Sequence, residues 1–150
     1  ERVSVSAYAA SQEPSKLYMT AGDSFTLNDL LYSLMLPSHN DTAVAIAEHV
    51  SGSTSAFAKK MNEKAKQLGC TSTHFVTPNG LDAGLNHYTT ARDLAKIAQY
   101  AWKNATFRKI VGTSAWRFFQ QAGPLLLRRH DQRTASDNER RHRYEDRIYQ

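Results

Sequence analysis

The triplet Ser38-His39-Asn40 has the residue types and spacing best suited to chemistry in this chain. It directly follows Pro37 and directly precedes an apolar run at residues 41–47. A serine hydroxyl can relay a proton, and an asparagine amide can both donate to and accept from a peptide group. A Ser-x-Asn triplet alone is weak, since it arises by chance about once in a few hundred positions. On local sequence alone, a serine that caps the next helix is the favoured interpretation.

Two helices must position this triplet. Apolar residues recur at helical spacing from Leu27 to Met35, and Thr26 and Asp29 are spaced as a capping box. Residues 41–50 are apolar on most sides, which predicts a helix buried in the middle of a domain. Asp41 lies near its start, where the helix dipole favours a negative charge. The triplet is therefore expected in a short loop between two helices, with the His39 side chain facing solvent.

Further along the chain, the pattern predicts two more helices. The first carries an apolar stripe that Gly69 ends, at Phe57, Met61, Ala65 and Leu68. The second helix is capped by Thr90 and Asp93. Its inward-facing side chains are expected to be Leu94, Ile97, Ala98 and Ala101. Residues 77–80 are typical of a turn. Apolar and polar residues alternate weakly around Val3 and Val5 and along residues 16–20, which predicts short strands.

Composition fits one domain of 150 residues, 41% hydrophobic, with a formal charge of +5. Apolar runs are far shorter than the roughly 20 residues that span a membrane. The single cysteine, Cys70, excludes an internal disulfide and a multi-cysteine zinc site. The six histidines show no paired metal-ligand spacing, so neither a metal nor a cofactor is expected.

Residues 26–53, 57–82 and 87–102, in this order, resemble the D-alanyl-D-alanine carboxypeptidases, which are penicillin-binding serine peptidases. The resemblance covers residues 1–116. It implies an α/β fold, in the form of a helix-rich fragment of a β-lactamase/transpeptidase-like domain. It also implies a parent enzyme that trims peptidoglycan stem peptides ending in D-Ala-D-Ala and binds β-lactams. That enzyme is expected to be membrane-associated and extracytoplasmic, with its signal segment outside this chain and with no specific nucleic acid as partner.

The resemblance also assigns roles to the triplet. Ser38 would relay a proton between the lysine beside the nucleophile and the leaving group, while Asn40 would hydrogen-bond the substrate amide and orient that lysine. The family's other two motifs are Ser-x-x-Lys and Lys-Thr-Gly. This sequence contains neither motif, so the fragment is expected to be inactive alone. The alternative is a non-catalytic helical module for binding or interaction.

After Trp116 the basic residues change in type. Eight lysines and three arginines lie in residues 1–116, whereas residues 117–150 contain eight arginines and no lysine. This polar tail is expected to be largely disordered, and a nucleic-acid-binding arm is the less favoured interpretation because acids are mixed into it. Read one nucleotide later, codons for residues 144–150 permit Met-Lys-Thr-Gly-Tyr-Thr. We therefore consider the tail an out-of-frame translation of a segment that carried the missing Lys-Thr-Gly.

Overall fold

The computed structural model describes residues 1–81, 84, 86–120 and 123–128. Its N-terminal part contains β1 (Arg2–Ser4), α1 (Ala7–Ala10) and β2 (Ser24–Thr26). Five helices follow: α2 (Leu27–Met35), α3 (Asn40–Ser51), α4 (Thr54–Gln67), α5 (Ala91–Trp102) and α6 (Ala105–Gly112). The described part ends with β3 (Ala115–Gln120) and β4 (Gly123–Arg128).

Helices α2 and α3 form as the sequence predicts. Thr26 is the N-cap of α2, and its Oγ1 accepts the backbone N–H of Asp29 at 3.1 Å. In α3 every residue from Asp41 to Ala47 is buried, which confirms the prediction of a helix inside the domain. Burial ends before the last turn, because Val50 is 46% exposed.

The hydrophobic core lies between these helices and the β1–β2 pair. The two strands are antiparallel, with Val3 opposite Phe25, so both side chains enter the same core. Leu30 from α2 and Val44 from α3 pack there with almost no exposed surface. The strand predicted near Val3 is therefore confirmed at residues 2–4.

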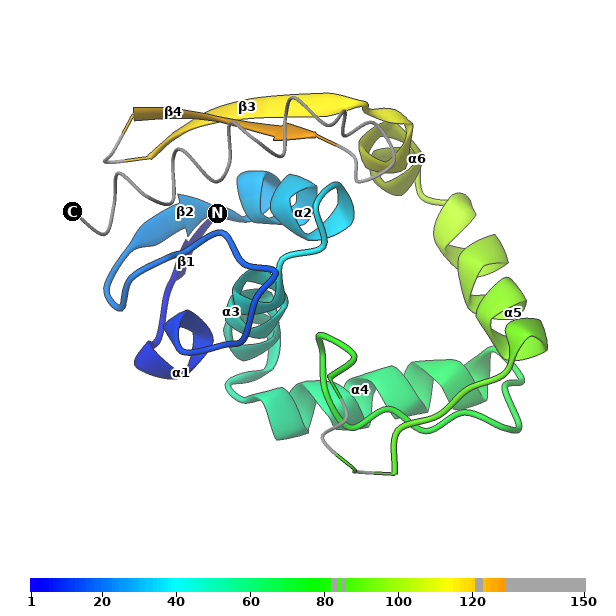
Figure 1. The fold of residues 1–150 in the computed structure, drawn as a ribbon. Helices are drawn as coiled ribbons and strands as arrows, with labels where there is room; N and C mark the ends of the chain where they lie inside the picture. Colours follow the sequence, from blue (N-terminus) through cyan, green and yellow to red (C-terminus); the bar gives the residue numbers. More distant parts are fainter. Residues whose placement is uncertain (82–83, 85, 121–122, 129–150) are drawn as a thin grey trace.

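Figure 1 shows α2 to α6 arranged around an arc, with the β3–β4 hairpin lying along α2 and α6. Helix α3 packs on both α2 and α4, α5 packs on α6, and α6 returns to contact α2. Within the described residues, no helix has the length and apolar character needed to cross a bilayer.

The predicted inward face of α5 is wrong for two of its four residues. Leu94 is 49% exposed and Ala98 is also exposed, while Ile97 and Ala101 are half-buried. The capping is as predicted, since Thr90 Oγ1 accepts the Asp93 N–H at 3.2 Å. The helix thus forms from its own local signals, but in the described part of the chain much of its apolar face lies open.

The loop between α4 and α5 is held by a buried carboxylate. Asp93 is 2% exposed, and its Oδ2 accepts hydrogen bonds from Ser72 N at 2.9 Å and Thr73 Oγ1 at 2.8 Å. Lys96 Nζ lies 3.0 Å from its Oδ1. The backbone N–H of Ser72 first, then Lys96 and Thr73, lower the pKa of Asp93 from 3.8 to about 2. Asp93 therefore fixes the loop to the first turn of α5.

Residues 16–20 do not form the predicted strand. Their backbone groups bind a side chain instead of a neighbouring strand. Asp41 Oδ1 accepts Leu17 N at 3.0 Å, and Asp41 Oδ2 accepts Met19 N at 3.3 Å. Buried and less buried side chains do alternate along this segment, since Leu17 and Met19 are buried.

The expected disorder of residues 117–150 is wrong for residues 117–120 and 123–128, which belong to the antiparallel β3–β4 hairpin. The hairpin is anchored through Trp116, whose ring stacks on Tyr32 at a centroid distance of 3.9 Å. Trp116 Nε1 also donates to Asp29 Oδ1 at 2.9 Å. Backbone pairing and this anchor provide the order that composition alone did not predict. Residues 121–122 and 129–150, with the proposed out-of-frame motif, lie outside the described residues.

Candidate functional site

The Ser-x-Asn triplet lies in the predicted place, in the tight connection between α2 and α3. Leu36 ends α2, Pro37 is buried, and His39 is the N-cap of α3. Ser38 is exposed and has φ of 63°, in the left-handed region that residues with a Cβ seldom adopt. Among the described residues its hydroxyl has no hydrogen-bond partner. The connection therefore presents the Ser38 side chain at the surface.

Asn40 is the first residue of α3 and is tied to the loop that follows α1. Its backbone N–H donates to Ser15 O at 2.8 Å, and its Nδ2 donates to Glu13 O at 3.0 Å. The neighbouring Asp41 carboxylate holds residues 17 and 19 of the same loop. Four hydrogen bonds thus fix the start of α3 against residues 13–19. Within the described residues, the amide oxygen of Asn40 has no hydrogen-bond partner and is available as an acceptor.

The expectation that His39 faces solvent is wrong. Its side chain is 6% exposed, and Nδ1 lies 2.9 Å from Ser33 Oγ on α2. Ser33 Oγ lies 2.9 Å from Thr42 Oγ1 on α3. The buried ring has the Ser33 hydroxyl as a polar partner beneath the loop, where an unpaired imidazole would be costly.

Helix capping by Ser38 is also excluded. The N-cap of α3 is His39, and no side chain makes the capping hydrogen bond there. Ser38 lies one residue earlier, with its hydroxyl free of backbone N–H partners among the described residues. The interpretation favoured by local sequence therefore does not account for this serine.

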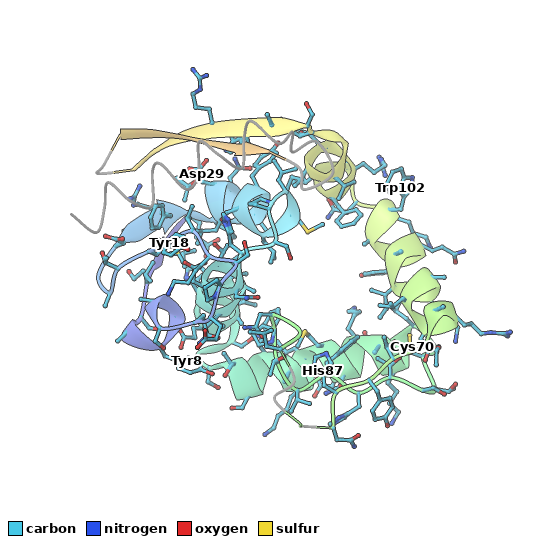
Figure 2. The ribbon with its side chains drawn as sticks, viewed as in Figure 1. Tyr8, Tyr18, Asp29, Cys70, His87 and Trp102 are labelled. Atoms are coloured by element: carbon cyan, nitrogen blue, oxygen red, sulfur yellow. The ribbon has the colours of Figure 1, made fainter. Side chains whose placement is uncertain are left out.

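The sequence interpretation missed Ser33, Thr42 and the structural role of Asp41. A signal for them was present, because each is a polar residue in a stretch that is otherwise apolar and buried. Buried polar side chains require partners, so polar residues on both sides of a tight loop indicate a shared network. Figure 2 marks Asp29 on α2 beneath the hairpin, where it binds Trp116 and supports the same helix from its other end.

The arrangement offers one exposed hydroxyl and one amide acceptor on a rigid connection. That is enough to relay a proton and to orient a peptide group, but not to form a covalent intermediate. In the part of the chain that the structure describes, no cluster of three His, Cys, Asp or Glu side chains could hold a metal ion. These two groups can therefore assist a reaction but cannot by themselves complete one.

A family model described as D-alanyl-D-alanine carboxypeptidase (Peptidase_S11) matches residues 1–133. The chain belongs to this family. The match runs beyond residue 116, where the sequence resemblance ended, and so includes the β3–β4 hairpin.

Two curated members of the D-alanyl-D-alanine carboxypeptidase family show the extent of the similarity. The D-alanyl-D-alanine carboxypeptidase of Streptomyces sp. (strain K15) is 44% identical over 115 residues, which cover 73% of this chain and 39% of that protein. The D-alanyl-D-alanine carboxypeptidase DacF of Bacillus subtilis (strain 168) is 39% identical over 113 residues, covering 75% and 29%. The chain thus spans less than half the length of these relatives.

Solved structures confirm the transpeptidase-like fold class. The crystal structure of D-alanyl-D-alanine carboxypeptidase from Mycobacterium tuberculosis H37Rv superposes with a TM-score of 0.80 at 34% identity. The superposition covers 87% of this chain and 50% of that one. The expected helix-rich piece of an α/β domain is therefore correct.

Proposed function

We propose that this chain is the part of a serine-type D-Ala-D-Ala carboxypeptidase that supplies Ser38 and Asn40 to the active site. The reaction is acylation of a serine by the penultimate D-Ala of a peptidoglycan stem peptide, followed by hydrolysis. The observation that carries the proposal is the exposed, left-handed Ser38 on a connection fixed from both sides. The match of the family model to residues 1–133 also supports the proposal.

In this reaction Ser38 passes a proton between the lysine beside the nucleophile and the departing D-Ala amine. Its hydroxyl suits the task because it both donates and accepts a hydrogen bond. Asn40 orients the peptide amide with its side-chain oxygen, while its Nδ2 stays on Glu13 O. The substrate is a D-Ala-D-Ala stem peptide, β-lactams compete with it, and no nucleic acid takes part. The enzyme acts at the cell-wall side of the cytoplasmic membrane, with which it is associated.

A labelled penicillin tests the proposal. The 150-residue chain alone is expected to remain unlabelled, because proton relay and orientation do not replace a nucleophile. The chain joined to a gene segment that encodes Ser-x-x-Lys, and with its frame corrected near codon 117, is expected to be labelled covalently. In that extended protein, Ser38→Ala and Asn40→Ala should each slow acylation by about 10²–10⁴.

Two results would overturn the assignment. One is labelling of the unextended chain. The other is an extended protein that contains all three motifs and is folded, but stays unlabelled. The conservative control is Ser53→Ala, which removes the N-cap hydroxyl of α4 and should leave acylation at the unmodified rate.

A non-catalytic interaction module is the second candidate. The observation in its favour is the set of large apolar side chains exposed on α5, namely Leu94, Tyr100 and Trp102. Covalent penicillin labelling of the extended protein would exclude this candidate, since binding alone forms no acyl bond.

A further inference from the structure

Ser38 adopts a conformation that its own residue type disfavours. A residue with a Cβ at φ of 63° persists only where its surroundings fix it more strongly than the local strain opposes. Its own side chain does not provide this, because the hydroxyl has no partner among the described residues. The neighbours of Ser38 must therefore hold it.

One anchor next to Ser38 is the His39 side chain. Its Nδ1 lies 2.9 Å from Oγ of Ser33, which is fully buried near the end of α2. Ser33 Oγ is in turn 2.9 Å from Oγ1 of the fully buried Thr42, in the first turn of α3. A chain of three polar side chains thus joins the two helices beneath the connection that carries Ser38.

This network is satisfied with either neutral tautomer of the ring. If Nδ1 carries the proton, it donates to Ser33, and the Ser33 hydroxyl donates to Thr42. If Nδ1 is bare, Thr42 donates to Ser33, and Ser33 donates to the ring. Both directions leave the same distances, so the anchor does not depend on one proton position.

We propose that His39 is a positioning residue, which holds Ser38 in its left-handed conformation by binding Ser33. The part of the proposal that concerns acylation rests on the proposed function, because it takes Ser38 to be the proton relay. Ser38 and Asn40 are held by different anchors. Asn40 is fixed by Ser15 and Glu13, whereas Ser38 is fixed through His39. Removal of the ring should therefore release Ser38 and leave Asn40 in place.

Nuclear magnetic resonance of the full chain tests the structural part. The intraresidue HN–Hα NOE and the one-bond Cα–Hα coupling of Ser38 both depend on the sign of φ. His39→Ala and Ser33→Ala should each move these values toward those of negative φ, while the amide shift of Asn40 stays near its original position. His39→Asn places a hydrogen-bonding group close to the position of Nδ1 and should restore the Ser38 values.

The matched control is His49→Ala, which removes a histidine whose Nε2 binds Glu1 Oε1 at 2.7 Å, far from this loop in sequence. It should leave Ser38 unchanged. If His39→Ala does not fold, Ser33→Ala and His39→Asn decide the question, because they remove less volume. Positive φ at Ser38 in every folded variant that lacks the Ser33–His39 hydrogen bond would overturn the proposal.

Acylation by penicillin in the extended protein tests the functional part. His39→Ala should reduce the acylation rate constant by up to about 100-fold with little change in the preceding non-covalent affinity, and His39→Asn should recover most of it. If the wild-type extended protein is not labelled, the proposed function fails while the magnetic resonance result stands independently. The positioning role is wrong under a different result. In that result the wild-type extended protein is labelled, Ser38→Ala slows acylation, and His39→Ala is acylated as fast as wild type.

Discussion

Asp41 shows how a single buried side chain can support two structural features. Its carboxylate accepts backbone N–H groups from Leu17, Met19 and Thr42 at 3.0, 3.3 and 2.8 Å. It therefore ties the loop before β2 to the start of α3, next to Ser38 and Asn40. A carboxylate suits this position because it is an acceptor with several lone pairs, and it lies at the positive end of the helix dipole.

Replacing Asp41 should be strongly destabilising. Asp41→Ala leaves buried N–H groups without an acceptor, and we expect a loss of about 2 kcal/mol or more in the free energy of unfolding. Urea unfolding followed by circular dichroism measures it. Asp23→Ala is the matched control, because Asp23 accepts the N–H of Thr20 near the surface and should cost well under half as much. Equal losses in the free energy of unfolding of the two variants would show that burial of the Asp41 hydrogen bonds adds nothing to stability.

Asp93 should make stability depend on pH in the acid range. Its pKa falls from 3.8 in the unfolded chain to about 2 in the folded protein, so folding favours the ionised carboxylate. This stabilisation is complete above about pH 4 and is lost as the pH falls toward about 2. The stability difference between wild type and Asp93→Asn should therefore be constant near neutrality and shrink below pH 4. A difference that grows on acidification would contradict the depressed pKa.

At the scale of elements, Trp116 is an aromatic anchor that joins the hairpin to α2. Trp116 stacks on Tyr32 with an interplanar angle of 3° and donates to Asp29. Aromatic side chains bury large areas and dominate the energetics of the contacts that they make. Trp116 therefore contributes directly to the docking of β3 on α2.

Trp116→Ala should release the hairpin from α2. We expect about 2 kcal/mol of lost stability and faster amide hydrogen exchange at residues 115–120. Trp116→Phe keeps an aromatic ring but loses the Nε1–H bond to Asp29, so it should fall between the alanine variant and wild type. Unchanged exchange at β3 in Trp116→Ala would show that the hairpin is held by other contacts.

Sequence patterns predicted the helices well because their signals are local. The cap at Thr26 directly precedes the apolar pattern from Leu27 to Met35, and the structure reproduces both. The burial of His39 was not predictable in this way, since its partner Ser33 is on another helix and only the fold brings the two together. The hairpin was missed for a similar reason, because the Trp116 anchor involves residues far earlier in the chain. Ser38 and Asn40 were located correctly by motif and context, while their catalytic roles stay predictions.

For the whole molecule, the exposed apolar residues of α5 are the main feature. Trp102, which is labelled in Figure 2, is 58% exposed. Leu94 and Tyr100 are 49% and 47% exposed. Soluble monomers seldom leave such side chains grouped on one helix. The chain also spans less than half the length of its curated relatives.

The 150-residue chain should therefore be marginally stable and tend to aggregate, because association would bury this apolar surface. Sedimentation velocity should show concentration-dependent species, and a thermal scan should give a broad transition. Leu94→Lys should reduce association, whereas Lys59→Leu on α4 should not. A soluble wild-type monomer with a cooperative transition above ordinary temperatures would refute this expectation.

The contacts around Ser38 and the contact at Trp116 differ greatly in sequence separation. Ser33 binds His39 and Thr42 across six and nine residues, whereas Trp116 reaches Asp29 across 87. Short separations close quickly and long ones slowly, because chain entropy must be lost before the contact forms. On a ribosome, the α2–α3 connection can thus assemble while the C-terminal third is still being made. We therefore expect the loop that carries Ser38 to form early in folding and the hairpin to dock later on a unit already in place.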